Sequence, residues 1–528
     1  MSNHAYESAA ALRPSSNGPV PISTLSERFS LAPASAEDAA ALNDLSILGV
    51  SVDSGDTAPG ELFVGLPGFT VHGARFAAEA VASGAVAVLT DSDGAQIVHE
   101  SAPGTPVLVH DDPRAVVGPL SAEAYHHPAR GLVTTAVTGT NGKTTTAYFL
   151  DAILSAHVGG CMVAGTVELR VGERSVESPR TTVEAPVLQR MMALAVEDKV
   201  GAASLEASSH AIVLHRLDGI VVDVAGFTNL QRDHLDFHKT MEGYLEAKAQ
   251  LFTPEHARRG VVCVDDQWGA ALAAEAPIEI DRVRAYPGET PADWWVSDAA
   301  VSLTDSATTF TLHGPDGEQI EASCPLPGLV NVQNAALALV MAIRAGVPAA
   351  TATAALAGAH NIPGRMQRIS QRDGRRGLCI VDFAHTPEAM ELALKAVRPI
   401  TPGRLIVVFG SDGDRDQGKR PMLGEVCARL ADVLVVTDEN PRSEDPQLIR
   451  NAILEGVRGV RPDLTDVEEI TTWRGDAVRR GVELCGPNDT VIVTGKGHEP
   501  FLEMAGEFIR YNDAPVMAEA VEKKWGRA

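Results

Sequence analysis

The sequence predicts an α/β fold made of several domains. Apolar, strand-like runs alternate with helical patterns along nearly the whole chain, as they do in sheets covered by helices. The chain has 528 residues, which suggests about three to four domains at roughly 150 residues each. Hydrophobic residues make up 45% and charged residues 21% of the chain, so large buried cores can form.

Three segments of distinctive composition suggest how the chain divides into domains. Residues 124–130 and 362–366 carry Pro, Gly and polar side chains, and residues up to about 20 are rich in Ser, Asn and Pro. We therefore expect a loose tail at 1–20, a first domain at 21–130, a second at 131–363 and a third at 364–528. The elements expected in the first two domains are strands at 61–66 and 85–89, helices at 77–83 and 334–345, and a hairpin at 310–320 around Pro-Asp-Gly.

Charge and cysteine content exclude several classes of protein. Lys and Arg total 44 against 69 Asp and Glu, a formal charge of −25, which opposes binding to nucleic acid or to an anionic membrane. A local basic pocket for a small anion remains compatible with this charge. The six cysteines are scattered without a C-x-x-C pair, so we expect neither zinc nor disulfides and a reducing cytosol. No apolar run approaches the length of a membrane span, and the N-terminus does not read as a signal peptide.

A glycine-rich loop in the second domain predicts phosphate binding. A β-branched strand at 132–137 leads into Thr138-Gly-Thr-Asn-Gly-Lys-Thr-Thr145, and a helical pattern follows. Gly139 and Gly142 let the backbone wrap closely, Lys143 adds positive charge, and Thr144 can reach Mg²⁺. The spacing is shorter than the standard Walker loop. The alternative is an ordinary glycine turn before a helix with a surface lysine.

Two more strand ends in this domain carry ionisable groups. A buried strand at 202–205 ends in Glu206, where a carboxylate can hold Mg²⁺ beside a nucleotide. A strand at 221–227 leads into a polar run that includes His234. Either residue could instead be structural, as a solvated strand end or a satisfied histidine.

Lys248 lies on the apolar face of a predicted helix. The helix begins near Thr240, and Met241 and Tyr244 precede Lys248 by seven and four residues on the same face. Burial of an ammonium is costly and lowers its pKa, which makes the amine chemically available. The alternative is a lysine that reaches water past its stem.

Four buried strands in the last third end in charged or glycine-rich segments. Open α/β sheets bind ligands outside the carboxyl ends of their strands, so these segments are expected to converge on one crevice. Arg and Glu side chains there would suit a zwitterionic ligand. The strands are 378–381, 405–409, 433–436 and 491–493, followed by 382–387, 410–421, 437–442 and 494–499.

These motifs resemble the Mur ligase family from about residue 50 to about residue 513. The shared motifs are G-T-N-G-K-T, E-x-S-S-H, F-T-N-L-x-R-D-H-L-D, A-K-x-x-L-F, N-x-P-G-R, D-x-A-H-x-P, G-D-R-D-x-G-K-R and G-K-G-H-E. The resemblance implies three domains: a UDP-binding N-terminal domain, a central P-loop ATPase domain and a C-terminal Rossmann-like domain that binds the incoming amino acid. It also implies an ATP- and Mg²⁺-dependent ligase of cytoplasmic peptidoglycan synthesis. Such a ligase would join a diamino acid to UDP-N-acetylmuramoyl-L-alanyl-D-glutamate, and we expect a monomer.

The resemblance assigns roles residue by residue. The implied ATP site consists of Gly139, Thr140, Asn141, Gly142, Lys143, Thr144, Thr145, Asn334, Arg365 and Asp382. The implied metal ligands are Thr144, Glu206, His234 and Lys248, the last as a carbamate formed with CO₂. The implied contacts to the UDP-linked substrate are Val52, Ser54, Phe69, Thr70, Val71, Thr181, Thr182, Ser208 and Arg216. The implied amino-acid site is Arg415, Glu439, Asn440, Pro441, Arg442, Gly495 and Glu499.

Departures from the family pattern leave the amino acid open. The family's diaminopimelate motif is D-N-P-R, whereas this chain has Glu439 in the first position, and Ser411 and Asp412 stand where small residues are usual. Arg442 would suit the second carboxylate of meso-diaminopimelate, but L-lysine stays nearly equal. Two further alternatives are a folylpolyglutamate synthase-like ligase and a nucleotide-binding regulator without ligation chemistry.

Overall fold

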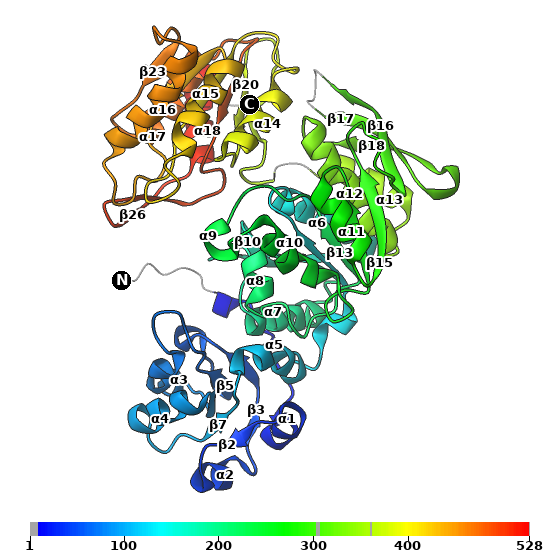
Figure 1. The fold of residues 1–528 in the computed structure, drawn as a ribbon, viewed down its shortest axis with the longest axis vertical. Helices are drawn as coiled ribbons and strands as arrows, with labels where there is room; N and C mark the ends of the chain where they lie inside the picture. The colour runs from blue at the N-terminus through cyan, green and yellow to red at the C-terminus, as the bar shows by residue number, and fades with distance from the viewer. Residues whose placement is uncertain (1–8, 303–306, 360–361, 527–528) are drawn as a thin grey trace. The chain divides into compact units, whose positions relative to one another are not determined.

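The computed structural model describes residues 9–302, 307–359 and 362–526, which fold into two compact units (Figure 1). The first unit comprises the described residues up to 295 together with 336–355, and the second comprises those of 296–335 and from 356 onward. Among the described helices, none has the length and apolar content needed to cross a bilayer. All six cysteines are buried and unbridged.

The first unit begins with a five-stranded sheet in the order β2-β7-β6-β5-β4. Strands β4 to β7 are parallel, and β2 pairs antiparallel with β7. The predicted strands at 61–66 and 85–89 and the predicted helix at 77–83 correspond to β5, β6 and α3. The elements are α1 (Ile22–Phe29), β2 (Ala32–Pro33), α2 (Ala36–Leu42), β4 (Gly49–Ser51), β5 (Glu61–Val64), α3 (Ala77–Ala82), β6 (Ala87–Thr90), α4 (Ser92–Ser101), β7 (Val107–Val109) and α5 (Pro113–Ala124).

The segment from residue 9 to residue 20 is packed, which differs from the loose tail that its composition predicts. Leu12 is fully buried in the core around the central sheet. Arg190, on α7 (Ala185–Glu197), donates hydrogen bonds from its guanidinium to the carbonyl oxygens of Ala9 (2.7 Å) and Leu12 (3.2 Å). Val20 then begins the two-residue strand β1. The burial of Leu12 and the hydrogen bonds from Arg190 therefore help to order a segment whose composition suggests a loose tail.

Six parallel strands form the centre of the next sheet, in the order β9-β12-β8-β13-β14-β15. Two short antiparallel strands, β10 and β11, extend it beside β9. The strands are β8 (Val133–Thr138), β9 (Cys161–Ala164), β10 (Glu168–Val171), β11 (Arg174–Glu177), β12 (Ala202–Glu206), β13 (Val224–Phe227), β14 (Arg259–Cys263) and β15 (Glu279–Arg284). The helices are α6 (Lys143–Val158), α7, α8 (Ser209–Val213), α9 (Leu235–His238), α10 (Met241–Ala249) and α11 (Gln267–Glu275).

The segment after β15 contains the predicted hairpin and the predicted helix. Strands β17 (Thr308–His313) and β18 (Gln319–Cys324) pair antiparallel around a turn at Pro315–Gly317. The helix expected at 334–345 is α12 (Leu329–Arg344), which begins earlier than predicted. The remaining elements are β16 (Trp294–Val301) and α13 (Ala349–Ala357).

The C-terminal part of the second unit is a six-stranded sheet in the order β19-β20-β24-β21-β22-β23, coloured yellow to red in Figure 1. All neighbours are parallel except β19 and β20. Three of the four predicted strands match to the residue, because these Val- and Ile-rich runs are buried on both faces. The strands are β19 (Gln367–Ser370), β20 (Leu378–Val381), β21 (Leu405–Phe409), β22 (Val433–Val436), β23 (Val467–Glu469) and β24 (Thr490–Val493), with a hairpin of β25 (Phe501–Met504) and β26 (Glu507–Arg510). The helices are α14 (Pro387–Val397), α15 (Lys419–Leu430), α16 (Pro446–Val460), α17 (Arg474–Leu484) and α18 (Asp513–Trp525).

Candidate active site

The glycine loop after β8 has the backbone geometry of a phosphate cradle. Gly139 (φ 143°) and Gly142 (φ 89°) lie in conformations that residues with a Cβ rarely adopt. A Cβ on Gly139 would lie 1.8 Å from Thr228 Oγ1. Lys143 begins the 16-residue helix α6, and its amine donates to the carbonyl oxygens of Gly139 (3.0 Å) and Thr140 (2.9 Å). The loop, the lysine and the helix N-terminus therefore fit the phosphates of a nucleotide.

Residues after β13 hold this loop in place. Asn141 donates from its backbone N–H to Asn229 Oδ1 (3.1 Å) and from its side chain to Gln231 Oε1 (2.8 Å). Thr228 Oγ1 donates to the Asn141 carbonyl oxygen (2.6 Å). The sequence motif specifies Thr228 and Asn229 and leaves the position of Gln231 variable, and its spacing alone does not reveal that these residues brace the phosphate loop.

Glu206 lies at the carboxyl end of β12, beside the phosphate loop, and is 1% exposed. Its carboxylate accepts hydrogen bonds from Thr144 Oγ1 (2.9 Å), Thr166 Oγ1 (2.9 Å) and Thr166 N–H (2.8 Å). Hydroxyl and carboxylate oxygens are the ligands that Mg²⁺ prefers, so Thr144 and Glu206 fit a magnesium ion. Thr166 is a site neighbour that the sequence did not single out.

Lys248 is buried against the same loop. It is 1% exposed, and its amine donates to the Gly139 carbonyl oxygen (2.8 Å) and lies 4.4 Å from the ring centroid of Tyr244. Burial, with the nearby charge of Lys143 adding to it, lowers the pKa of Lys248 well below its ordinary value. This burial rules out the alternative in which the amine reaches water, and it favours the neutral form of the amine beside the phosphate loop.

His234 is the most exposed of the predicted metal ligands. Its side chain is 47% exposed, lies 3.4 Å from an Asp233 carboxylate oxygen and faces the ring of His210 at a centroid distance of 4.9 Å. Over the described parts of the chain, the structure contains no group of three His, Cys, Asp or Glu side chains placed to hold a metal. The four-ligand set that includes His234 thus stays a prediction.

The residues predicted to contact the muramoyl part of the substrate gather around Glu206. Thr182 donates from Oγ1 to the Glu206 carbonyl oxygen (2.7 Å) and accepts from the backbone N–H of Ser208 (3.0 Å). Thr166 Oγ1 is within hydrogen-bond distance of Thr181 Oγ1 (3.2 Å). Arg216 donates to the Thr182 carbonyl oxygen (3.2 Å), and burial lowers the pKa of its guanidinium. The tertiary structure therefore brings this predicted set together.

The predicted uridine contacts lie in the N-terminal sheet region. Ser54 is buried and donates to Glu79 Oε2 (2.9 Å), while Val52 is partly buried at the end of the same segment. Phe69 is 88% exposed and Val71 45% exposed, with Thr70 between them on the surface. An exposed phenylalanine is a surface on which a base could stack.

Three predicted nucleotide contacts fall within the second unit. Asp382 accepts hydrogen bonds from the backbone N–H groups of Met366 (2.8 Å) and Ala384 (2.9 Å), and burial raises the pKa of its carboxyl group. The guanidinium of Arg365 lies 4.3 Å from the ring centroid of Phe383. Asn334 is 2% exposed, and its Oδ1 accepts no hydrogen bond from the described residues.

The predicted amino-acid residues are arranged around a lysine that the sequence analysis did not select. Lys496, fully buried within the G-K-G-H-E motif, donates to Asn440 Oδ1 (2.9 Å), Glu499 Oε2 (3.0 Å) and the Phe501 carbonyl oxygen (2.5 Å). Asn440 also donates from Nδ2 to Glu499 Oε2 (3.1 Å). The structure thus brings Asn440 and Glu499 together through Lys496.

Three other predicted members of this group lie on the loops that follow β21 and β22. Pro441 packs on the neighbouring loop, where a Cβ on Gly413 would lie 1.9 Å from its carbonyl oxygen. Arg442 has a left-handed backbone (φ 55°) and lies 3.6 Å from a carboxylate oxygen of Glu503. Arg415 is exposed on the loop after β21.

Glu439 and Gly495 are in direct contact. Glu439 is 2% exposed, and burial, with the charge of Asp412 adding to it, raises the pKa of its carboxyl group to about 8. A Cβ on Gly495 would lie 2.3 Å from Glu439 Oε2, so only glycine fits beside this carboxyl group.

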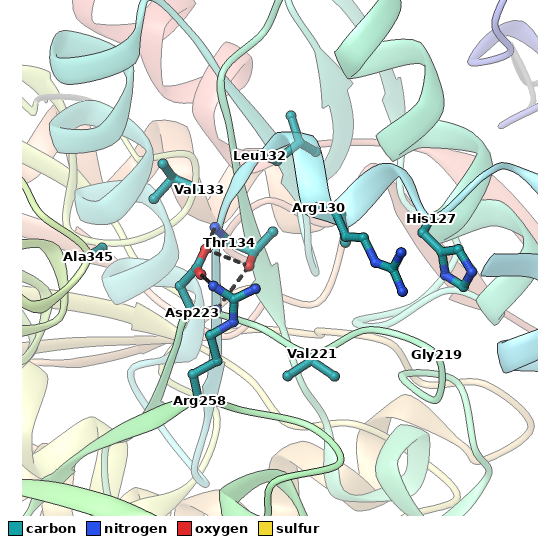
Figure 2. A pocket seen from close by; sticks show the side chains of 11 residues that line it. His127, Arg130, Leu132, Val133, Thr134, Gly219, Val221, Asp223, Arg258 and Ala345 are labelled. Atoms are coloured by element: carbon teal, nitrogen blue, oxygen red, sulfur yellow. Dashed lines mark hydrogen bonds and ion pairs between the residues drawn. The ribbon is translucent and has the colours of Figure 1, made fainter. Parts of the chain in front are cut away.

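A separate cavity of about 630 Å³ lies at the amino end of β8 (Figure 2). In Figure 2, Arg258 and Thr134 both contact the Asp223 carboxylate, with Arg258 Nη1 at 3.0 Å and the Thr134 N–H at 2.8 Å. The phosphate loop follows the opposite end of this six-residue strand, roughly 20 Å away at about 3.3 Å per residue. The cavity contains no predicted site residue, so we assign it no part in the reaction. Its lining residues are His127, Ala129, Arg130, Leu132, Val133, Thr134, Gly219, Val221, Asp223, Arg258 and Ala345.

Fold and site together define a nucleotide-dependent α/β enzyme with a phosphate loop in its central sheet and an ionisable, glycine-rich site on a C-terminal parallel sheet. Comparison with known protein families agrees with this class and identifies the family. Residues 137–342 match the Mur ligase middle domain, residues 364–497 match the Mur ligase glutamate ligase domain, and residues 46–125 match the Mur ligase family catalytic domain.

Similar whole proteins support the same assignment. The chain is 43% identical over 480 residues to a UDP-N-acetylmuramoyl-L-alanyl-D-glutamate--2,6-diaminopimelate ligase of Streptomyces coelicolor, covering 91% of this chain and 93% of that protein. It is 42% identical to a UDP-N-acetylmuramyl-tripeptide synthetase of Leifsonia xyli, covering 89% and 91%. The chain therefore belongs to the Mur ligase family and is an ATP-dependent, ADP-forming ligase, as predicted.

Solved structures confirm the predicted three-domain Mur ligase architecture. A UDP-N-acetylmuramoyl-L-alanyl-D-glutamate--2,6-diaminopimelate ligase superimposes with a TM-score of 0.64 at 31% identity, covering 91% of this chain and 95% of that chain. A folylpolyglutamate synthase of Mycobacterium tuberculosis complexed with ADP reaches a TM-score of 0.57 at 20% identity over 77% of this chain and 93% of that chain, and so shares the fold alone.

Proposed function

We propose that this protein joins a diamino acid to the D-glutamate side-chain carboxylate of UDP-N-acetylmuramoyl-L-alanyl-D-glutamate during peptidoglycan precursor synthesis in the cytoplasm, acting as a monomer. The observation that carries the proposal is the cluster at the phosphate loop. Lys143 and Lys248 both donate to the Gly139 carbonyl oxygen, and Thr144 donates to the buried Glu206. Its relatives named for this reaction add support across nine-tenths of the chain.

The reaction requires activation of a carboxylate. Condensation of an acid with an amine in water is uphill, so the D-glutamate carboxylate is proposed to attack the γ-phosphate of ATP, which gives an acyl phosphate and ADP. The amine of the incoming amino acid then attacks the acyl carbon, and phosphate leaves. Lys143 would hold the phosphate oxygens as negative charge builds on them. Mg²⁺, held by Thr144, Glu206, His234 and carbamylated Lys248, would neutralise phosphate charge.

The carbamate on Lys248 is part of this proposal. Burial lowers the pKa of Lys248 and so favours its neutral form, and a neutral amine can add to CO₂ with loss of one proton. The product would replace a buried amine by an anion beside the phosphate loop. Such a group can assist a metal ion, which an ammonium cannot do.

We assign the substrates to the predicted sets of residues. Thr181, Thr182, Ser208 and Arg216 lie around Glu206 and would orient the muramoyl dipeptide, while the region of Ser54 would hold the uridine. The loops that contain Arg415, Asn440 and Glu499 would bind the diamino acid, with meso-diaminopimelate and L-lysine as the candidates. The corresponding domains are proposed to be 21–130, 131–363 and 364–528.

Phosphate release from ATP tests the proposal. The expected result is release that needs both the UDP-muramoyl dipeptide and a diamino acid, with a product whose mass equals the dipeptide plus one amino-acid residue. A folylpolyglutamate synthase-like enzyme would instead use a folate and glutamate. A nucleotide-binding regulator would show no dependence on both co-substrates, and that outcome would refute the proposal.

A further inference from the structure

Two departures from the family pattern, Asp412 and Glu439, interact with each other in the structure. Asp412 follows β21 and Glu439 follows β22, and these strands are parallel neighbours. Their loops are in contact, because the Gly413 N–H donates to the Asn440 carbonyl oxygen (2.8 Å). The charge of Asp412 is one cause of the raised pKa of Glu439. The two carboxyl groups therefore share one local environment.

Four buried oxygen atoms at this place accept no hydrogen bond from the described residues. Glu439 is 2% exposed, and its Oε2 accepts no hydrogen bond from the described residues. The same holds for three other buried oxygens of these two loops, which are Ser411 Oγ, Asp412 Oδ1 and Thr437 Oγ1. Buried polar atoms normally have partners, and an unpaired buried carboxylate is especially costly. A group of unpaired acceptors in a substrate site indicates that the ligand supplies the donors.

The neighbouring cationic side chains donate their hydrogen bonds to groups other than these four oxygen atoms. Lys496 donates to Asn440, Glu499 and the Phe501 carbonyl oxygen. Arg474 donates to both carboxylate oxygens of Asp513. Gly495 leaves no side chain beside Glu439 Oε2, where a Cβ would lie at 2.3 Å. Lys419, whose charge also acts on Glu439, donates from its amine to the His385 carbonyl oxygen (3.2 Å). An ammonium from outside the protein can therefore supply the hydrogen-bond donors that the unpaired oxygen atoms lack.

The arginine that could receive a second ligand carboxylate already has a carboxylate neighbour. Arg442 Nη1 lies 3.6 Å from Glu503 Oε2, and both side chains are largely buried. The Arg442 N–H also donates to the Glu503 carbonyl oxygen (3.0 Å), so the backbone fixes this pairing. Glu503 reduces the positive potential with which Arg442 could attract another anion.

We propose that Asp412 and Glu439 bind the distal ammonium of the incoming amino acid and make the protein select a diamino acid with a single carboxylate, such as L-lysine or L-ornithine, over meso-diaminopimelate. This inference rests on the proposed function. An ammonium offers three donors and one positive charge, which match the unpaired oxygens and the two carboxyl groups. A bound ammonium would favour the ionised form of Glu439, whose pKa is otherwise raised to about 8. A second carboxylate on the same distal carbon would be repelled by this ionised Glu439 and by Asp412.

The test compares kcat/KM for L-lysine, L-ornithine and meso-diaminopimelate in the wild type and in Asp412→Asn and Glu439→Gln. The wild type is expected to prefer a single-carboxylate diamino acid by about tenfold or more. Each variant is expected to lower kcat/KM for that substrate by about tenfold, mainly through KM, because a charge-assisted hydrogen bond is lost. The ratio to meso-diaminopimelate should move toward one. L-Norleucine, which lacks the distal ammonium, should not inhibit the wild type.

Matched controls separate specificity from folding. Glu455→Gln removes one exposed charge from α16 and should leave the ratio unchanged. An unchanged KM for ATP and an unchanged melting temperature would show that the two test variants bind nucleotide and fold as the wild type does. A wild type that prefers meso-diaminopimelate, or variants that lower all substrates equally, would overturn the inference while leaving the ligase reaction intact. A wild type that ligates none of these amino acids would instead refute the proposed function.

Discussion

The buried ion pair of Arg474 and Asp513 provides a quantitative test of how the C-terminal site is held. Both side chains are fully buried, and Arg474 donates to Asp513 Oδ1 (2.9 Å) and Oδ2 (2.8 Å). Arg474 also donates to the carbonyl oxygens of Asp438 (3.0 Å) and Thr494 (2.8 Å). These carbonyls directly precede Glu439 and Gly495, so one guanidinium ties together two loops of the amino-acid site.

Arg474→Met should leave the Asp513 carboxylate buried without its cation. Removal of one partner of such a pair costs about 3–5 kcal/mol. For a unit of this size, each kcal/mol lowers the melting temperature by about 2–4 °C, so we expect the transition of the second unit to fall by roughly 6–20 °C. Differential scanning calorimetry of the full chain would measure this shift. The KM for the amino acid should rise in the same variant.

Arg480→Met is the control on the same helix. Arg480 pairs with Glu468 at 2.8 Å, but both side chains are more than a third exposed, and such surface pairs contribute about 0–1 kcal/mol. Replacement of both buried charges, in Arg474→Met with Asp513→Leu, should recover part of the loss because no unpaired charge remains. Equal destabilisation by Arg474→Met and Arg480→Met would contradict this account of the ion pair.

Three further predictions concern the reaction and its pH dependence. Lys143→Ala should abolish phosphate release while the protein stays folded, and normal turnover in this variant would remove Lys143 from its role. Lys248→Ala should lower kcat by about 10²–10³, the size of effect seen when one electrostatic contact to a transition state is lost, and small carboxylates such as acetate should partly restore it; full activity without an additive would exclude the carbamate. Burial raises the pKa of Glu439 from 4.5 to about 8, so the folded state holds this proton more tightly and wild-type stability should fall, relative to Glu439→Gln, as pH rises from about 4.5 to about 8. Denaturant unfolding of both proteins at the two ends of this range would measure the difference, and parallel curves would refute it.

Local sequence signals predicted the elements and motifs that depend on neighbouring residues. The strands at 378–381, 405–409 and 433–436 were predictable to the residue because short Val- and Ile-rich runs between turns specify buried parallel strands. Thr240 was predictable as a helix N-cap, and its hydroxyl accepts from the Gly243 N–H. The family assignment followed from the same local motifs and is confirmed.

Contacts between distant residues were not predictable in this way. Thr166 reaches Glu206 across 40 residues, and Arg474 reaches Asp513 across 39. Residues 9–20 look disordered by composition, yet Leu12 is buried through contacts with α7. Nothing in the local sequence specifies these partners.

Lys248 and Glu439 show which properties the local sequence determines and which depend on the tertiary structure. The sequence by itself determined that a lysine lies on an apolar helix face and that an acidic residue follows a buried strand, because side-chain periodicity and strand order are local properties. Only the tertiary structure decided that Lys248 reaches the Gly139 carbonyl oxygen and that Glu439 shares its surroundings with Asp412. The physical reason is that burial and charge–charge interaction, which set the pKa of both groups, depend on chain segments that only folding brings together.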